Sequence, residues 1–255
     1  MLYGFMPHLV TVVAKQHGMI KFSQVDIKVI VFIIPIQEYV KKYIKLLIFK
    51  YLGYNNTERI INMLNIFILL FFIYSFVGWI LEEIYAFYIH KKFINRGFLM
   101  GPLCPLYGVG CLALTFVLHR FSNNILLLFI LSMLICSVIE YLISYLLEKL
   151  FSLRWWDYSN MKFNINGRIC LETTILFGII GILVIKFINP FLINILTNIN
   201  IKTVNIITLI LVIIFTVDLI ISSYLTLKIK DKNPKVDATE YIKKYIHENI
   251  KNIFS

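Results

Sequence analysis

Long hydrophobic blocks, separated by short polar segments, dominate the chain from about residue 60 onward. Each block approaches or exceeds the roughly 20 residues that a helix needs to cross a bilayer. The blocks run from about Ile60 to Ile89, Met100 to Leu118, Asn124 to Leu147, Leu171 to Ile188 and Thr203 to Leu227. This pattern predicts an all-α, polytopic integral membrane protein with about five transmembrane helices in contact with the lipid bilayer.

The second block is the least regular of these. It opens with Gly101 and Pro102 and also holds Pro105, Gly108 and Gly110. Because these residues disfavour a continuous helix, the first half of this span is predicted to be irregular or re-entrant. Such backbone exists at membrane depth only where protein covers it or where it lines a cavity.

Amphipathic surface helices are predicted at both ends of the chain. Apolar residues recur at helical spacing among lysines from Val40 to Tyr51, which predicts a helix lying on the membrane or packed on the protein. In the tail, Asp237 and Glu240 form a capping box ahead of a short helix with isoleucines on one side. The predicted divisions are an N-terminal extension (1–60), a transmembrane domain (61–227) and a basic C-terminal tail (228–255).

Composition and charge support a membrane location. The 255 residues are 59% hydrophobic and 15% charged, with a net charge of +11, whereas soluble domains are about 45–50% apolar and about 25% charged. Lysine and arginine gather in the loops after the first and third spans and in the tail, which places these segments on the cytoplasmic side. The basic N-terminal segment would then lie outside, unless one span is not a true crossing. We expect the bacterial cytoplasmic (cell) membrane as the location and no nucleic-acid partner.

The sequence lacks the common signatures of metal sites and enzymes. Its four cysteines form no C-x-x-C pair, and no histidine lies at ligand spacing to them. The patterns G-x-x-x-x-G-K-[ST], H-E-x-x-H and G-x-S-x-G do not occur. We therefore predict no catalytic residues, no metal, no cofactor and no enzymatic activity.

Two similar segments predict an internal repeat. KFINRGFLMGPLCPLYGVG (92–110) and KFNINGRICLETTILFGIIG (162–181) both begin with Lys-Phe, reach a cysteine and continue into an apolar segment with two glycines. The helix–loop–helix hairpins 61–118 and 124–188 would then be two copies in the same orientation, an arrangement that places transporter sites between copies. Coincidence within a biased composition is the alternative, and superposition of the two hairpins decides between them.

One long polar segment, RWWDYSNMKFNINGRICLE (154–172), separates two strongly apolar blocks. The predicted contact for a protein partner consists of Arg154, Trp155, Trp156, Asp157 and Tyr158. The two tryptophans also suit the aromatic belt at a membrane interface, and anchoring is the simpler role for them. Arg154 and Asp157 also suit a local ion pair.

Carboxylates inside the predicted spans need a partner or a function, because burying them in lipid costs a few kcal/mol. The first span carries Ser75, Gly78, Glu82 and Tyr85 on one helical face, and the third carries Ser137, Glu140, Ser144 and Glu148. Glu82 and Glu140 are the deepest acids on these two faces and would line a path for a polar substrate or an ion. Alternatively, they form buried ion pairs with Arg96, Arg154 or Arg168 that fix the loops to the helix ends.

Several motifs carry a resemblance to a known family: FIYSFVGWILE (72–82), KFINRGFLMGPLCPLYGVG (92–110), EYLISYLLEKLF (140–151) and RWWDYSNMKFNINGRICL (154–171). Over roughly residues 67–191 the chain resembles the bacterial family called putative ABC-transporter type IV, or CmpB-like, membrane proteins. The resemblance implies the membrane permease half of a transporter that relies on a separate ATPase subunit. It transfers no catalytic role to any residue.

Other functions remain open at this level. A non-transporting scaffold or regulatory protein of the cell envelope would use the same loop to bind a partner and the same acids for structure. An intramembrane enzyme that acts on lipid headgroups would use Glu82 or Glu140 as its base. A homo-oligomer is a further candidate assembly.

Overall fold

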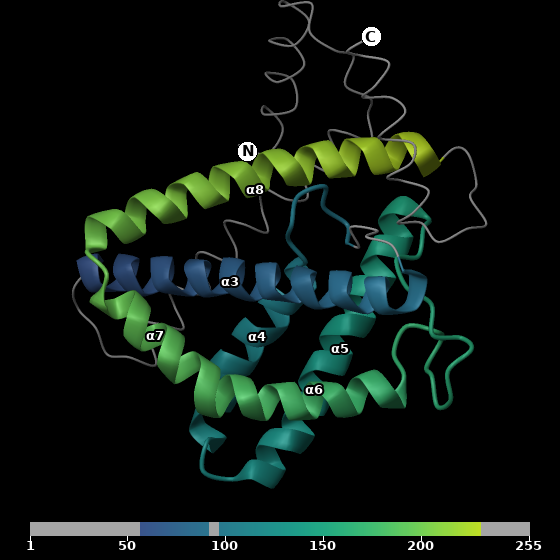
Figure 1. Cartoon of the computed structure of the whole chain (residues 1–255), viewed down its shortest axis with the longest axis horizontal. Helices are drawn as coiled ribbons and strands as arrows, with labels where there is room; N and C mark the ends of the chain where they lie inside the picture. Colours follow the sequence, from purple (N-terminus) through teal and green to yellow (C-terminus); the bar gives the residue numbers. More distant parts are fainter. Residues whose placement is uncertain (1–56, 92–96, 231–255) are drawn as a thin grey trace, which may run out of the picture. The chain divides into compact units, whose positions relative to one another are not determined.

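The computed structural model describes residues 57–91 and 97–230, and within them it contains helices and loops but no strand. The chain divides into two compact units between Ile60 and Ile61, and most of the described residues belong to the second unit. The helices are α3 (Thr57–His90), α4 (Pro105–Leu118), η1 (His119–Phe121), α5 (Ile125–Phe151), α6 (Leu171–Leu183), the π-helical turn η2 (Val184–Ile188), α7 (Asn189–Asn198) and α8 (Ile201–Lys230) (Figure 1). The all-α prediction is confirmed, while both predicted surface helices lie outside the described residues.

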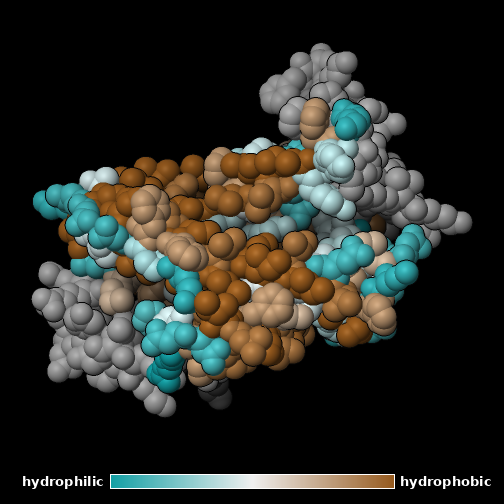
Figure 2. Space-filling model, turned by 60° about the horizontal axis from the view of Figure 1, so that its bottom comes forward, coloured by the Kyte–Doolittle hydropathy of each residue, from teal (hydrophilic) through white to brown (hydrophobic). Residues whose placement is uncertain are grey.

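Four helical stretches in the described part are long and apolar enough to cross a membrane. They are Ile61–Tyr88, Ile125–Phe151, Leu171–Asn198 and Ile201–Leu227. Their outer surfaces carry exposed apolar side chains such as Ile179, Leu209 and Ile214. Figure 2 shows hydrophobic side chains over most of one face, with hydrophilic ones gathered toward its edges. Apolar surface of this extent requires lipid around it, so the chain is a multi-pass membrane protein.

The second predicted span is only partly helical, as its glycines and prolines indicated. Residues 97–104 form an irregular segment, and α4 then runs for 14 residues, or about 21 Å at the usual rise of a helix. The backbone N–H of Cys104 donates to the carbonyl oxygen of Ser75 at 2.9 Å. Helix α4 therefore begins beside the middle of α3, and the irregular segment lies at the depth of the helices.

Asp218 of α8 supports the irregular segment. Its carboxylate accepts the backbone N–H of Met100 at 3.1 Å and that of Gly101 at 2.9 Å. The Ser222 hydroxyl donates to the same carboxylate at 3.0 Å. A Cβ on Gly101 would approach Asp218 Oδ2 to 2.8 Å, so glycine permits this close contact. A deeply placed acid thus provides the acceptors that lipid cannot offer to non-helical backbone.

The fourth predicted span is longer than the sequence suggested. The prediction ended it at Ile188, before Asn189 and Pro190, but the helical stretch continues to Asn198. The π-helical turn η2 immediately precedes these residues, and such a turn lets a helix continue past a proline that lacks a backbone donor. Asn189 itself is buried, accepts the Tyr74 hydroxyl at 2.5 Å and donates to Thr115 Oγ1 at 2.8 Å. Polar bonds of this kind join α3, α4 and α7 inside the bundle.

The loops after α3 and α5 and the end of α8 lie on one side of the bundle. Phe98, Phe151 and Trp155 pack ring against ring, with centroids 5.2–5.8 Å apart. Leu225 of α8 packs against the same cluster. These are the three regions whose basic residues predicted a shared side of the membrane.

Candidate functional site

The loop between α5 and α6, residues 152–170, is folded by its own hydrogen bonds. The N–H of Tyr158 donates to the carbonyl of Gly167 at 2.7 Å, and the indole N–H of Trp156 donates to the carbonyl of Arg168 at 3.0 Å. Ile165 and Ile169 form an isolated antiparallel bridge. The loop is therefore a compact structure, built from short polar side chains and turns.

Asp157 closes one turn of this loop. It accepts both the backbone N–H of Ser159 at 3.0 Å and its hydroxyl at 2.5 Å. Gly167 has a φ of +67°, and a Cβ there would collide with Asp157 Oδ1. The Ser159 bonds, together with the nearby Arg154 charge, lower the pKa of Asp157. Glycine and a charged aspartate are thus the residues that this turn requires.

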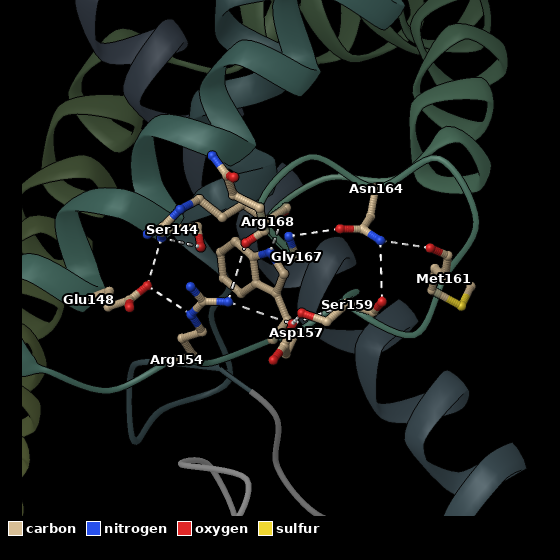
Figure 3. A network of polar contacts seen from close by, with 11 residues as sticks. Ser144, Glu148, Arg154, Asp157, Ser159, Met161, Asn164, Gly167 and Arg168 are labelled. Carbon is tan, nitrogen blue, oxygen red and sulfur yellow. Dashed lines mark hydrogen bonds and ion pairs between the residues drawn. The ribbon is translucent and has the colours of Figure 1, made fainter.

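Asn164 fixes the tip of the loop. Its side-chain N–H donates to the carbonyl of Met161 at 2.8 Å, and its Oδ1 accepts the N–H of Gly167 at 3.0 Å (Figure 3). The neighbouring Phe163 has a φ of +51°, a strained value for a bulky residue. Its side chain is 79% exposed. The Asn164 bonds hold an aromatic side chain out from the loop surface.

Glu148 is the acid that ties the loop to α5. Its Oε2 lies 2.8 Å from Arg154 Nε and 2.8 Å from Arg168 Nη1 (Figure 3). Arg168 is buried, also donates to Ser144 Oγ at 3.3 Å, and lies over the rings of two α5 tyrosines. Two arginines from opposite ends of the loop therefore share one carboxylate at the end of α5.

The two tryptophans of the loop have different environments. Trp155 packs with Phe98 and Phe151 in an apolar cluster, whereas Trp156 makes the backbone hydrogen bond to Arg168 described above. Both are partly buried. Neither indole ring stands free on the surface of the loop.

A second polar cluster lies deeper, where α3, α4 and α5 meet the loop. The Tyr107 hydroxyl of α4 donates to Glu82 Oε1 at 2.8 Å, and the Tyr158 hydroxyl of the loop donates to Glu140 Oε1 at 3.2 Å. Burial, then the negative charges of Glu140 and Glu82, raises the pKa of Tyr158 well above its usual value. Both carboxylates therefore lie close to one phenol, and we call Glu82, Tyr107, Glu140 and Tyr158 the polar centre.

The structure brings some predicted site residues together and separates others. Glu82 and Glu140 lie in the polar centre, whereas the recorded acid partner of Arg154 and Arg168 is Glu148. Arg154 also lies 3.6 Å from Asp157. Arg96 falls outside the described residues. Tyr158, predicted as part of a partner contact, turns inward to Glu140.

Of the two residues that organise these clusters, Tyr107 was not predicted as a site residue, and Glu148 was predicted only as a member of the polar face of the third span. Tyr107 lies in the PLYGVG stretch, three residues after Cys104, and nothing in its local pattern indicated an acid partner. Glu148 stands two helical turns after Glu140 on the same face, and this spacing was its only signal. Among the described residues, no group of three or more His, Cys, Asp or Glu side chains could hold a metal ion.

One comparison with known proteins gives a match. The model of a family described as putative ABC-transporter type IV matches residues 69–223, which is more than half of the chain. No curated protein and no solved structure matches. The match includes the polar centre, the loop between α5 and α6, and Asp218.

Proposed function

Because the chain belongs to the putative ABC-transporter type IV family, we propose that it is the membrane permease component of a transporter in the cytoplasmic membrane. Its 255 residues contain no P-loop, so the ATPase of this transporter would be a separate subunit. The observation that supports this role best is the polar centre inside an otherwise apolar bundle. Ionisable groups at this depth are costly and mark substrate or ion routes in membrane proteins.

The route would pass Glu82 and Glu140, which come from different helices. Their tyrosine partners Tyr107 and Tyr158 come from a third helix and from the loop. A site assembled from separate elements changes when those elements move relative to one another. This is the property that alternating access requires of a transport site.

The ATPase contact would lie at the tip of the loop between α5 and α6. The residues predicted for this contact, from Arg154 to Tyr158, are engaged within the protein. Lys162, Phe163 and Ile165 are exposed instead. An aromatic side chain on a fixed backbone loses little conformational entropy when it binds, which makes Phe163 a suitable anchor for a pocket in a partner.

The alternative is a non-transporting scaffold or regulatory protein of the cell envelope. The internal pairing of the loop favours it, because Arg154 and Arg168 both contact Glu148 without a ligand. In this alternative the exposed tip binds a regulated partner, and the polar centre only holds α3, α4 and α5 together.

Purification of the tagged full chain from its own host in a gentle detergent distinguishes these roles. The permease role predicts a stoichiometric P-loop ATPase that is lost with Phe163→Ser and retained with Lys202→Ala. Lys202 is a suitable control because it is exposed at the opposite end of α8 from the cluster around Trp155. If the ATPase still copurifies with Phe163→Ser, the contact does not depend on Phe163 and lies elsewhere than the tip. Absence of any ATPase, under conditions that preserve a known transporter complex, would contradict the permease role.

A further inference from the structure

Glu140 is a buried acid with half of its hydrogen-bonding capacity unused. Its side chain is 3% exposed, and it lies within the apolar stretch Ile125–Phe151. Oε1 accepts the Tyr158 hydroxyl, but Oε2 is buried without any hydrogen-bond partner. Within residues 57–91 and 97–230, Glu140 forms no ion pair, and the nearby Arg154 and Arg168 contact Glu148. An ionised carboxylate in this environment would lack a compensating charge.

Among the described residues, the surroundings of Glu140 add negative charge, and no cation forms an ion pair with it. Its electrostatic neighbours in the described part of the chain are Tyr158 from the loop, Glu82 from α3 and Cys136 from its own helix. Tyr107 and Cys170 interact in turn with Tyr158. Arg168 reaches Ser144, one turn further along α5, and forms its ion pair with Glu148. A second acid beside a buried acid disfavours ionisation of both at once.

We propose that the polar centre is a proton-binding site and that Glu140 carries the proton on Oε2. Binding converts the carboxylate into a neutral carboxyl group with a new O–H bond, and release returns the proton to water or to a carried ligand. A proton needs a single acceptor atom, whereas the described residues contain no group of three or more His, Cys, Asp or Glu side chains that could hold a metal ion. The site stands whether or not the chain transports, so it goes beyond the proposed permease role.

Tyr158 connects this site to the loop. Its hydroxyl donates to Glu140 Oε1, while its backbone N–H donates to Gly167 on the opposite side of the loop. A carboxylate accepts a stronger hydrogen bond than a neutral carboxyl group does. Loss of the proton therefore tightens the Tyr158 bond, and binding of the proton loosens it. The loop that carries Phe163 would respond to occupancy of the site.

Infrared spectroscopy of the purified full chain in lipid nanodiscs tests the proton directly. At neutral pH we expect the carbonyl stretching band of a protonated carboxyl group, with the small downward shift in heavy water that marks an exchangeable proton. Glu140→Gln should abolish this band. Glu172→Gln should retain it, because Glu172 is an exposed acid in the first turn of α6. A neutral-pH spectrum without the band, or a band that persists in folded Glu140→Gln, would overturn the proposal.

A second variant keeps the test decisive if Glu140→Gln does not fold. Tyr158→Phe removes the donor that favours the charged form, so the band should persist to higher pH than in the wild type. If the pH dependence of the band is the same in Tyr158→Phe as in the wild type, the titrating group is not Glu140, and the assignment is overturned. A band that appears only near pH 4, where ordinary glutamate titrates at about 4.3, would also overturn it.

Discussion

At the scale of single residues, Glu140 and Glu148 show how environment assigns different tasks to one residue type. Both lie on the same face of α5, two turns apart. Glu148 is one-third exposed and meets two arginine side chains. Glu140 is buried and accepts a hydrogen bond from a tyrosine hydroxyl. The sequence predicted the shared face, but the distinction depends on where the loop returns its arginines, which local spacing does not encode.

Replacement of Glu148 by glutamine tests the first of these tasks. The neutral amide keeps the shape of the side chain but removes the charge that both arginines share, so the loop should lose stability. We expect a cost of about 1–3 kcal/mol, a range that reflects charged hydrogen bonds in partly exposed surroundings. Thermal unfolding in detergent measures it. Glu172 is an exposed acid that forms no ion pair with the other described residues. Glu172→Gln should therefore leave the midpoint unchanged, and an equal loss in both variants would contradict this account.

The Asp157 turn predicts a pH dependence of the loop. Hydrogen bonds from Ser159 and the charge of Arg154 lower the pKa of Asp157 in the folded state. The stabilisation is therefore complete above the unfolded value of about 3.9 and is lost as the pH falls through the lower, folded value. Tryptophan fluorescence from about pH 6 to about pH 3 follows it, in a Trp79→Phe background that leaves the loop tryptophans.

Asp157→Asn provides the comparison for this experiment. The amide retains an acceptor oxygen but does not titrate, so the acid-induced change should shrink. A fluorescence transition of the same size and midpoint in Asp157→Asn would show that another group controls the loop at low pH.

At the scale of elements, the helices followed from the sequence more readily than their ends and supports. Hydrophobic blocks predicted all four long helical stretches of the described residues, because lipid imposes both length and apolar character on a crossing helix. The continuation from α6 into α7 was missed, since Asn189 and Pro190 resemble a helix end and a π-helical turn has no clear sequence signal. The contact of Asp218 with the segment around Gly101 spans more than 100 positions of the chain, so no local pattern predicts it.

The Asp218 contact predicts how the irregular segment depends on α8. Asp218→Ala would leave the Gly101 N–H without its acceptor, at a cost of about 1–3 kcal/mol. Asp218→Asn retains an acceptor oxygen and should cost less. Thermal unfolding compares both with Thr216→Ala, which removes only a bond within α8 to the carbonyl of Val212. Equal midpoints for Asp218→Ala and Thr216→Ala would mean that Asp218 does not support the segment.

At the scale of the whole molecule, the internal repeat stays a prediction, with one structural parallel in its favour. In the first hairpin Gly108 of α4 lies against Ser75 of α3, and in the second Gly181 of α6 lies against Ser132 of α5. Both serines are fully buried. Small residues at corresponding helix contacts are what two copies of one hairpin would retain. The unequal loops, with α4 starting deep and α6 starting at the bridge of a folded loop, would then be later divergence.

The loop between α5 and α6 connects the polar centre with the exposed tip. The polar centre lies inside the bundle, the tip with Phe163 is exposed, and Tyr158 and Glu148 connect the loop to α5 at two depths. If the chain is a permease, this loop would physically connect an ATPase outside the membrane with the polar centre within it. Such a link requires that changes at Glu140 alter ATP turnover while the ATPase remains bound.

The most direct measurement is therefore ATP hydrolysis by the complex purified with the wild-type chain and with Glu140→Gln, both in lipid nanodiscs. We predict equal amounts of a P-loop ATPase in the two complexes and a lower rate of ATP hydrolysis with Glu140→Gln. Equal rates would contradict coupling between the polar centre and the partner, and failure of any ATPase to bind the wild-type chain would contradict the permease role itself.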